Sequence, residues 1–153
     1  MRNNSARRSS SDSNFNFEVS ILGDKNILKN EVFPLIADGP LNGSECLEII
    51  DLSRKLRDDK VCVISSFSSY IEKEAFHFLL KGDQPIVIVI NDLNDFQIID
   101  TMIERIKNRN GLIVLLEREG QLVNFSEMSM FIKEFSSKRY KSDIILNSKE
   151  ISI

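Results

Sequence analysis

The polar side chains that could bind a ligand follow the apolar runs of this sequence. The clearest group is the serine-rich turn SSFSSY at 65–70, which separates the apolar run VCVIS from a helical pattern. Its serines are Ser65, Ser66, Ser68 and Ser69. Hydroxyls, backbone N–H groups and the positive end of a helix dipole together suit a phosphate. Helix capping by Ser68 or Ser69 is the simpler alternative.

Carboxylates occupy the corresponding positions after the next two apolar runs. Asp92 and Asp95 follow PIVIVI, and Glu117 ends LIVLLE. An acid at such a position can accept the hydroxyls of a ribose or bind a metal, although Asp95 can equally cap the following helix. The turn LGDKN completes the set of candidate phosphate- or nucleotide-binding residues with Gly23, Asp24 and Lys25.

Several kinds of chemistry are excluded by what the sequence lacks. It has no Walker A loop, and its first turn has one glycine rather than GxGxxG, so an ordinary dinucleotide site is not expected. His77, the one histidine, falls inside a helical pattern, and no group of residues has metal-ligand spacing. We therefore expect no catalytic residue, cofactor or bound metal, and the sequence favours binding over an enzymatic activity.

Strand and helix patterns alternate along the chain. Apolar runs indicate strands at 17–23, 61–65, 85–90, 112–117 and 144–147. Helical spacing of apolar residues indicates helices from 42–44 to the DDK at 58–60, at 71–82, at 95–111 and around 128–135, with a short helix around 28–36. The pattern is typical of an α/β, Rossmann-like three-layer fold with a mostly parallel sheet of about five strands.

In parallel sheets of this kind, ligands bind beyond the carboxyl ends of the strands. The segments that could form a site are therefore 23–25, 65–70, 91–95 and 117–121. Two states of the cleft beyond the serine-rich turn are left open. The cleft is either open and positive, or filled by Phe67 and Tyr70.

The composition is that of one globular domain. The 153 residues carry a formal net charge of −3, so the chain as a whole does not attract nucleic acid or an anionic membrane. Residues 1–16 have almost no apolar side chains and are predicted to form a flexible tail, with the domain at 17–153. No apolar run is long enough to span a bilayer. Cys46 and Cys62 are expected to be free thiols, which favours a reducing, cytoplasmic location.

Basic residues near the C-terminus surround an aromatic residue, a combination used in binding single-stranded nucleic acid. This cluster consists of Lys138, Arg139, Tyr140 and Lys141. Lys25 and Lys81 are other cations that could share a nucleic-acid-binding face with it. The alternative is that these cations serve solubility and complement the negative ends of helix dipoles.

In this order, the elements and turns resemble the DprA/Smf family of the SLOG-type Rossmann superfamily, over residues 17–147. The family's signature is a strand running into SGxARGID, followed by a helix, a glycine and a TIAVL strand. Here VISSFSSYIEKEAFHFLLKGDQPIVIVI has the same layout, with Ser65, Ile71 and Ala75 matching. Downstream, NGLIVLLE resembles an LLSE-like strand of the family, with Glu117 at its glutamate.

The resemblance implies a DNA-processing or recombination-accessory protein that binds single-stranded DNA and has a recombinase as partner. Ser69 stands at the signature arginine, and residues 128–130 read MSM where the family has RNR, which implies weakened or altered DNA binding. A nucleotide-ligand sensor and a non-catalytic interaction domain with a decayed pocket are the alternatives. The loop PGGxGTxxE of the related LOG phosphoribohydrolases is absent. Whether the chain forms a homodimer is left open.

Overall fold

The protein is a three-layer α/β domain, seen in a computed structural model that describes residues 16–135 and 148–151. Its strands are β1 (Glu18–Gly23), β2 (Val32–Pro34), β3 (Cys62–Ser65), β4 (Ile86–Ile90), β5 (Gly111–Glu117) and β6 (Lys149–Glu150). Its helices are the 3-10 helix η2 (Lys25–Lys29), α2 (Gly43–Asp58), α3 (Tyr70–Leu80), α4 (Phe96–Lys107) and α5 (Phe125–Phe135). The Rossmann-like architecture predicted from the sequence is confirmed.

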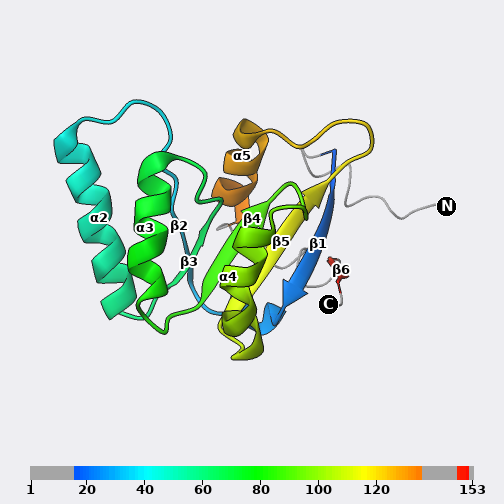
Figure 1. The fold of residues 1–153 in the computed structure, drawn as a ribbon, viewed down its shortest axis with the longest axis horizontal. Coiled ribbons are helices and arrows are strands. Elements are labelled where there is room, and N and C mark those ends of the chain that lie inside the picture. The colour runs from blue at the N-terminus through cyan, green and yellow to red at the C-terminus, as the bar shows by residue number, and fades with distance from the viewer. Residues whose placement is uncertain (1–15, 136–147, 152–153) are drawn as a thin grey trace.

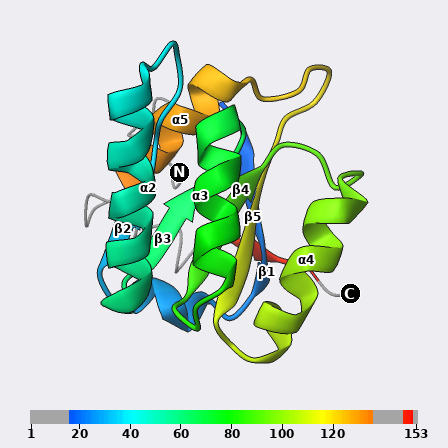
Figure 2. The same ribbon diagram turned by 60° about the vertical axis from the view of Figure 1, so that its left-hand side comes forward.

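The sheet has six strands in the order β2-β3-β4-β5-β1-β6. Strands β2 to β5 are parallel and lie side by side in chain order. Right-handed crossovers that all step in the same direction place their helices on the same face of the sheet. Accordingly, α2, α3 and α4 cover one face, and α5 lies on the other (Figures 1 and 2).

Strand β1 departs from the expected arrangement because it pairs antiparallel with β5. Glu18 lies opposite Glu117, and Gly23 lies opposite Leu112. The carboxyl end of β1 is therefore at the amino end of the parallel strands. A strand presents the same alternation of side chains in either direction, so the sequence pattern could not reveal this reversal.

Two apolar cores fill the spaces between the sheet and its two helical layers. In β4, Ile86, Ile88 and Ile90 pack toward α2, α3 and α4. The alternate residues Val87 and Val89 belong to the core on the α5 side. All five residues of β4 are buried, because β4 lies between its parallel neighbours β3 and β5 and helices cover both faces of the sheet.

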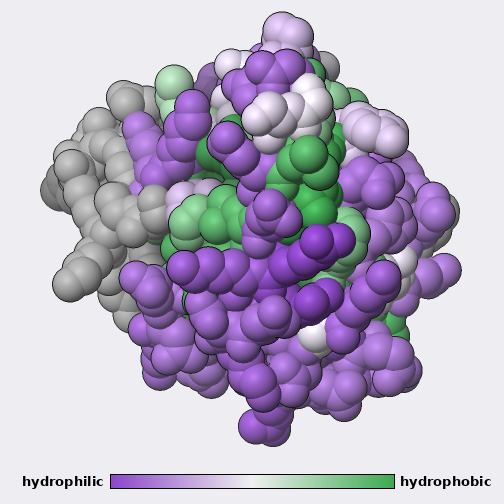
Figure 3. Space-filling model, turned by 90° about the vertical axis from the view of Figure 1, so that its left-hand side faces the viewer, coloured by the Kyte–Doolittle hydropathy of each residue, from purple (hydrophilic) through white to green (hydrophobic). Residues whose placement is uncertain are grey.

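The helix predicted around 28–36 is wrong. The chain instead forms η2 and then the edge strand β2, which pairs parallel with β3. Leu35 N–H donates to the Ile64 carbonyl of β3 at 2.9 Å. Because alternate residues of a strand point their backbone groups to opposite sides, the backbone nitrogen of Pro34 points away from β3. The sheet therefore loses no hydrogen bond through the missing N–H of this proline. This side of the molecule bears a band of apolar surface within hydrophilic surroundings (Figure 3). The strand predicted at 144–147 lies outside the described residues.

Within the described residues, each α-helix begins at a residue whose side chain accepts a backbone N–H group. Asn42, Ser69 and Asp95 cap α2, α3 and α4. Of the two serines that the sequence offered as a cap for α3, the cap is therefore Ser69. Asn124 caps α5 by accepting from Glu127 N–H at 2.9 Å. Among the described residues, no helix is long and apolar enough to cross a membrane.

Candidate ligand-binding cleft

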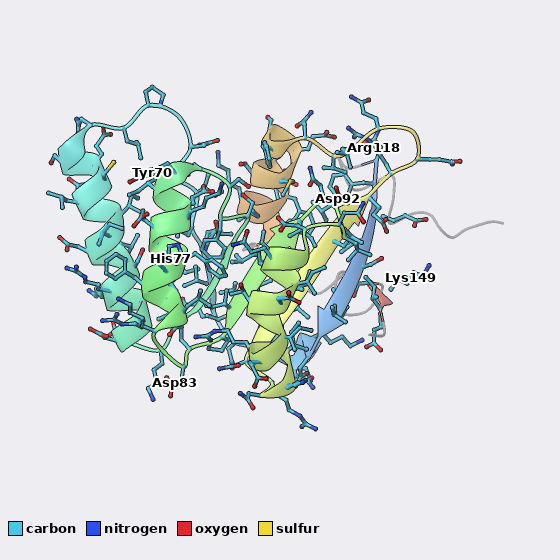
Figure 4. The ribbon with its side chains drawn as sticks, viewed as in Figure 1. Tyr70, His77, Asp83, Asp92, Arg118 and Lys149 are labelled. Atoms are coloured by element: carbon cyan, nitrogen blue, oxygen red, sulfur yellow. The ribbon has the colours of Figure 1, made fainter. Side chains whose placement is uncertain are left out.

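A cleft of about 450 Å³ opens beyond the carboxyl ends of β3 and β4. Its polar walls include Ser66, Ser68, Lys73, Asn91, Asp92 and Asp95. Apolar walls are supplied by α4 and α5, notably through Phe125. A second hollow of about 230 Å³ shares Asp92 with it and reaches Glu117 and Arg118 beyond β5. Figure 4 shows Asp92 and Arg118 toward this end of the sheet and Asp83 at the other end.

The serine-rich turn forms one wall of the cleft without filling it. Ser65 is buried, and its Oγ accepts from Phe67 N–H at 3.0 Å. Phe67 has a left-handed backbone, with φ of 48°, and its ring stacks on Phe76 at 4.5 Å between centroids. Tyr70 is 79% exposed. The cleft is therefore open, since neither ring occupies it, but it is not positive as well, because Asp92 and Asp95 line it and Lys73 is the one cation among its described lining residues.

The N–H groups that could have held a phosphate are used by the buried carboxylate of Glu72. Its Oε1 accepts from Ser68 N–H at 2.8 Å and from Ser69 N–H at 3.2 Å. Its Oε2 accepts from Ala37 N–H at 2.8 Å. Glu72 is 3% exposed, and Ser66 Oγ donates to it at 3.5 Å. The anion position at the start of α3 is thus filled by the protein itself.

Serine hydroxyls nevertheless remain at the wall of the cleft. Ser68 Oγ donates to Ser66 Oγ at 2.8 Å, so these two predicted site residues form one hydrogen-bonded pair. Ser69 faces elsewhere, because its Oγ donates to the Ala37 carbonyl at 2.7 Å and also caps α3. Ser66 and Ser68 are therefore the predicted serines that a ligand in the cleft can contact.

Asp92 and Asp95 bring carboxylate oxygens to the opposite wall. Asp92 Oδ1 accepts from Asn94 N–H at 2.9 Å, and Asp95 Oδ1 accepts from Ile98 N–H at 3.3 Å. Within the part of the chain that is described, neither Oδ2 has a hydrogen-bond partner, so each can accept a hydroxyl or amino proton. The predicted capping role of Asp95 is confirmed, and it leaves room for a ligand contact.

An ion pair fixes the loop between β5 and α5 that borders the second hollow. Arg118 donates to both carboxylate oxygens of Glu127, at 2.5 and 2.7 Å, and to the Leu122 carbonyl at 3.2 Å. The hydrogen bond from Arg118, aided by one from Asn124 N–H, lowers the pKa of Glu127. The same bond raises the pKa of Arg118. Sequence reasoning missed this pair, although the spacing Asn124-x-x-Glu127 is a capping-box signal.

The ion pair predicts an acid-sensitive contribution to stability. Because folding lowers the pKa of Glu127, the contribution is complete above the unfolded pKa of about 4.3 and is lost as pH falls through the folded pKa. The difference in melting temperature between the wild type and Glu127→Gln should therefore be smaller at pH 3 than at pH 7. A gap that stays constant between these pH values would contradict the assignment.

Two predicted groups lie away from the cleft. The turn Gly23–Lys25 follows the reversed strand β1 and is therefore at the amino end of the parallel strands. There Asp24 caps η2, and Lys25 Nζ forms an ion pair with Glu150 Oε1 at 3.8 Å. Lys81 ends α3 at the same end of the sheet and lies over the Phe78 ring, 5.3 Å from its centroid.

Two other residues that the sequence singles out, Glu117 and His77, do not line the main cleft. Glu117 borders the second hollow, and His77 is exposed on α3. The cluster Lys138, Arg139, Tyr140 and Lys141 lies outside the described residues. No group of three or more His, Cys, Asp or Glu residues in 16–135 and 148–151 could hold a metal ion.

Comparison with protein-family models, curated proteins and solved structures finds no match for this chain.

Proposed function

We propose that this chain is a binding domain that takes a ribose-bearing small molecule, a nucleoside or nucleotide, in the carboxyl-end cleft. The observation that carries the proposal is the open cleft of about 450 Å³, which combines Asp92 with an aromatic wall at Phe125. A ligand site of this class lies beyond the carboxyl ends of parallel strands, as this cleft does.

Each wall of the cleft suits one part of such a ligand. Phe125 is 62% exposed, so its ring is accessible to a planar base, and stacking on an aromatic ring tolerates any base. The oxygen of Asp92 that has no partner in the described residues can accept from ribose hydroxyls, a role that acids after a strand have in nucleotide-binding folds. The hydroxyls of Ser66 and Ser68 add further polar contacts.

Single-stranded DNA, the ligand that the family resemblance implies, suits the described surface less well. Affinity for a polyanion comes from cations along one face. Lys25 and Lys81 lie at the other end of the sheet from the cleft, whereas Asp92, Asp95 and Glu117 border the two hollows. A DNA-processing role, with a recombinase partner, would therefore depend on the cluster at 138–141.

Calorimetric titration with nucleosides and nucleotides tests the proposal. We expect at least one of them to bind and to raise the melting temperature, as a ligand of the folded state must. Replacing Phe125 by alanine should weaken binding about tenfold, because base stacking contributes about 1–3 kcal/mol.

A matched control is Met130→Ala, which removes another exposed side chain of α5 that does not line the cleft. It should leave binding unchanged. If no nucleoside or nucleotide binds while a dT oligonucleotide does, and does so less at higher salt, the DNA-binding role replaces the one proposed here.

A further inference from the structure

Among the described residues, each α-helix at the carboxyl end of the parallel strands has an acid at its start that accepts from a backbone N–H group. In α2 and α3, Glu45 and Glu72 complete capping boxes. In α4, Asp95 accepts from Ile98 N–H, and at α5 Glu127 accepts from Asn124 N–H at 3.1 Å. Free N–H groups at a helix start are the usual phosphate site of α/β folds. Here a carboxylate of the protein already lies at each of these helix starts, where it accepts from the N–H of the capping residue in α2, α3 and α5 and from a first-turn N–H in α4.

The charges that border the two hollows also disfavour a phosphate. Asp92, Asp95 and Glu117 contribute three carboxylates. Arg118 is matched by its ion pair with Glu127, so it adds little positive potential. Lys73 is the other cation at these walls, and it shares the cleft with two of the acids. An added phosphate would therefore meet like charges at the walls of the cleft.

We infer that the cleft selects a nucleoside and discriminates against its phosphate esters. The inference rests on the proposed function, and it names the ligand class for the same site. An uncharged ribose and base keep the contacts available at Asp92, Phe125 and the serine pair. A 5′-phosphate adds a charge that the surrounding acids repel.

Calorimetry with adenosine, guanosine, cytidine and uridine, each beside its 5′-monophosphate, tests the inference at about 0.15 M salt. We expect the bound nucleoside to have a Kd about tenfold or more below that of its monophosphate. The ratio should shrink severalfold in Asp95→Asn, because asparagine retains the helix cap and removes only the charge. Asp100→Asn makes the same change on the exposed side of α4 and should leave the ratio unchanged.

The outcomes separate the two proposals. A monophosphate that binds as tightly as its nucleoside, or more tightly, overturns the selectivity and leaves the binding function standing. A ratio that Asp95→Asn does not reduce overturns the electrostatic cause. Absence of binding by all eight compounds overturns the proposed function and the selectivity with it.

Discussion

Replacing Arg105 by methionine is expected to lower the free energy of unfolding by about 3 kcal/mol, because the carbonyls of Gln84 and Gly82 would lose the guanidinium donor. Arg105 is 8% exposed although it is an arginine. Its Nη1 donates to the Gln84 carbonyl at 2.6 Å. Its Nη2 donates to the Leu79 carbonyl at 3.3 Å and also to the Gly82 carbonyl. One guanidinium thus joins α4 to the end of α3 and the loop before β4.

The surroundings of Arg105 leave little room for an alternative arrangement. A side chain at Gly111 would come within 2.7 Å of Arg105 Cβ, so the start of β5 packs directly on this residue. Burial lowers the pKa of Arg105 below its ordinary value, and the Asp83 carboxylate acts in the opposite direction. Lysine has one ammonium in place of the planar fork, so Arg105→Lys should recover only part of the loss.

Urea unfolding of the three proteins, wild type, Arg105→Met and Arg105→Lys, measures these differences. Lys107→Met is the matched control, because it removes an exposed cation from the same last turn of α4. It should change the free energy of unfolding by less than about 0.5 kcal/mol. A loss below about 1 kcal/mol in Arg105→Met would show that water replaces the guanidinium at these carbonyls.

Local signals in the sequence predicted most elements of this fold. A continuous apolar run predicted β4, and residues with good capping side chains predicted the starts of α2, α3 and α4. These features depend on residues a few positions apart. The direction of β1 depends on its partner β5, almost a hundred residues away, so no local pattern contains it.

For the candidate site, the sequence predicted which chain segments would meet. The carboxyl ends of β3 and β4 were expected to meet, and Ser66, Ser68 and Asp92 do line one cleft. What the sequence could not supply was the partner of each group. Arg105 lies in the last turn of α4, a position typical of cations that complement the dipole of their own helix, yet it donates to carbonyls at the end of α3. Glu72 completes a local capping box, but it also accepts from Ala37 N–H, 35 residues away.

Removing the Glu72 carboxylate is expected to have the second large effect, and it tests whether this acid occupies an anion site. In Glu72→Ala, the N–H groups of Ala37, Ser68 and Ser69 lose their acceptor. Hydrogen bonds to a charged group contribute about 1.5–3 kcal/mol each, and water can replace part of them, so we expect a loss of about 3 kcal/mol. Hydrogen exchange at Ser68 and Ser69 should accelerate most, because these amides lose their bonds directly.

The variant should also gain a property that the wild type lacks. With the carboxylate gone, three N–H groups and the start of α3 surround a space suited to an anion. Phosphate at millimolar concentration should therefore raise the melting temperature of Glu72→Ala more than that of the wild type, measured against chloride at equal ionic strength. Glu74→Ala removes a neighbouring carboxylate of α3 and should show no such phosphate effect. Equal phosphate effects in all three proteins would mean that Glu72 only caps its helix and that the amides around it do not form an anion site.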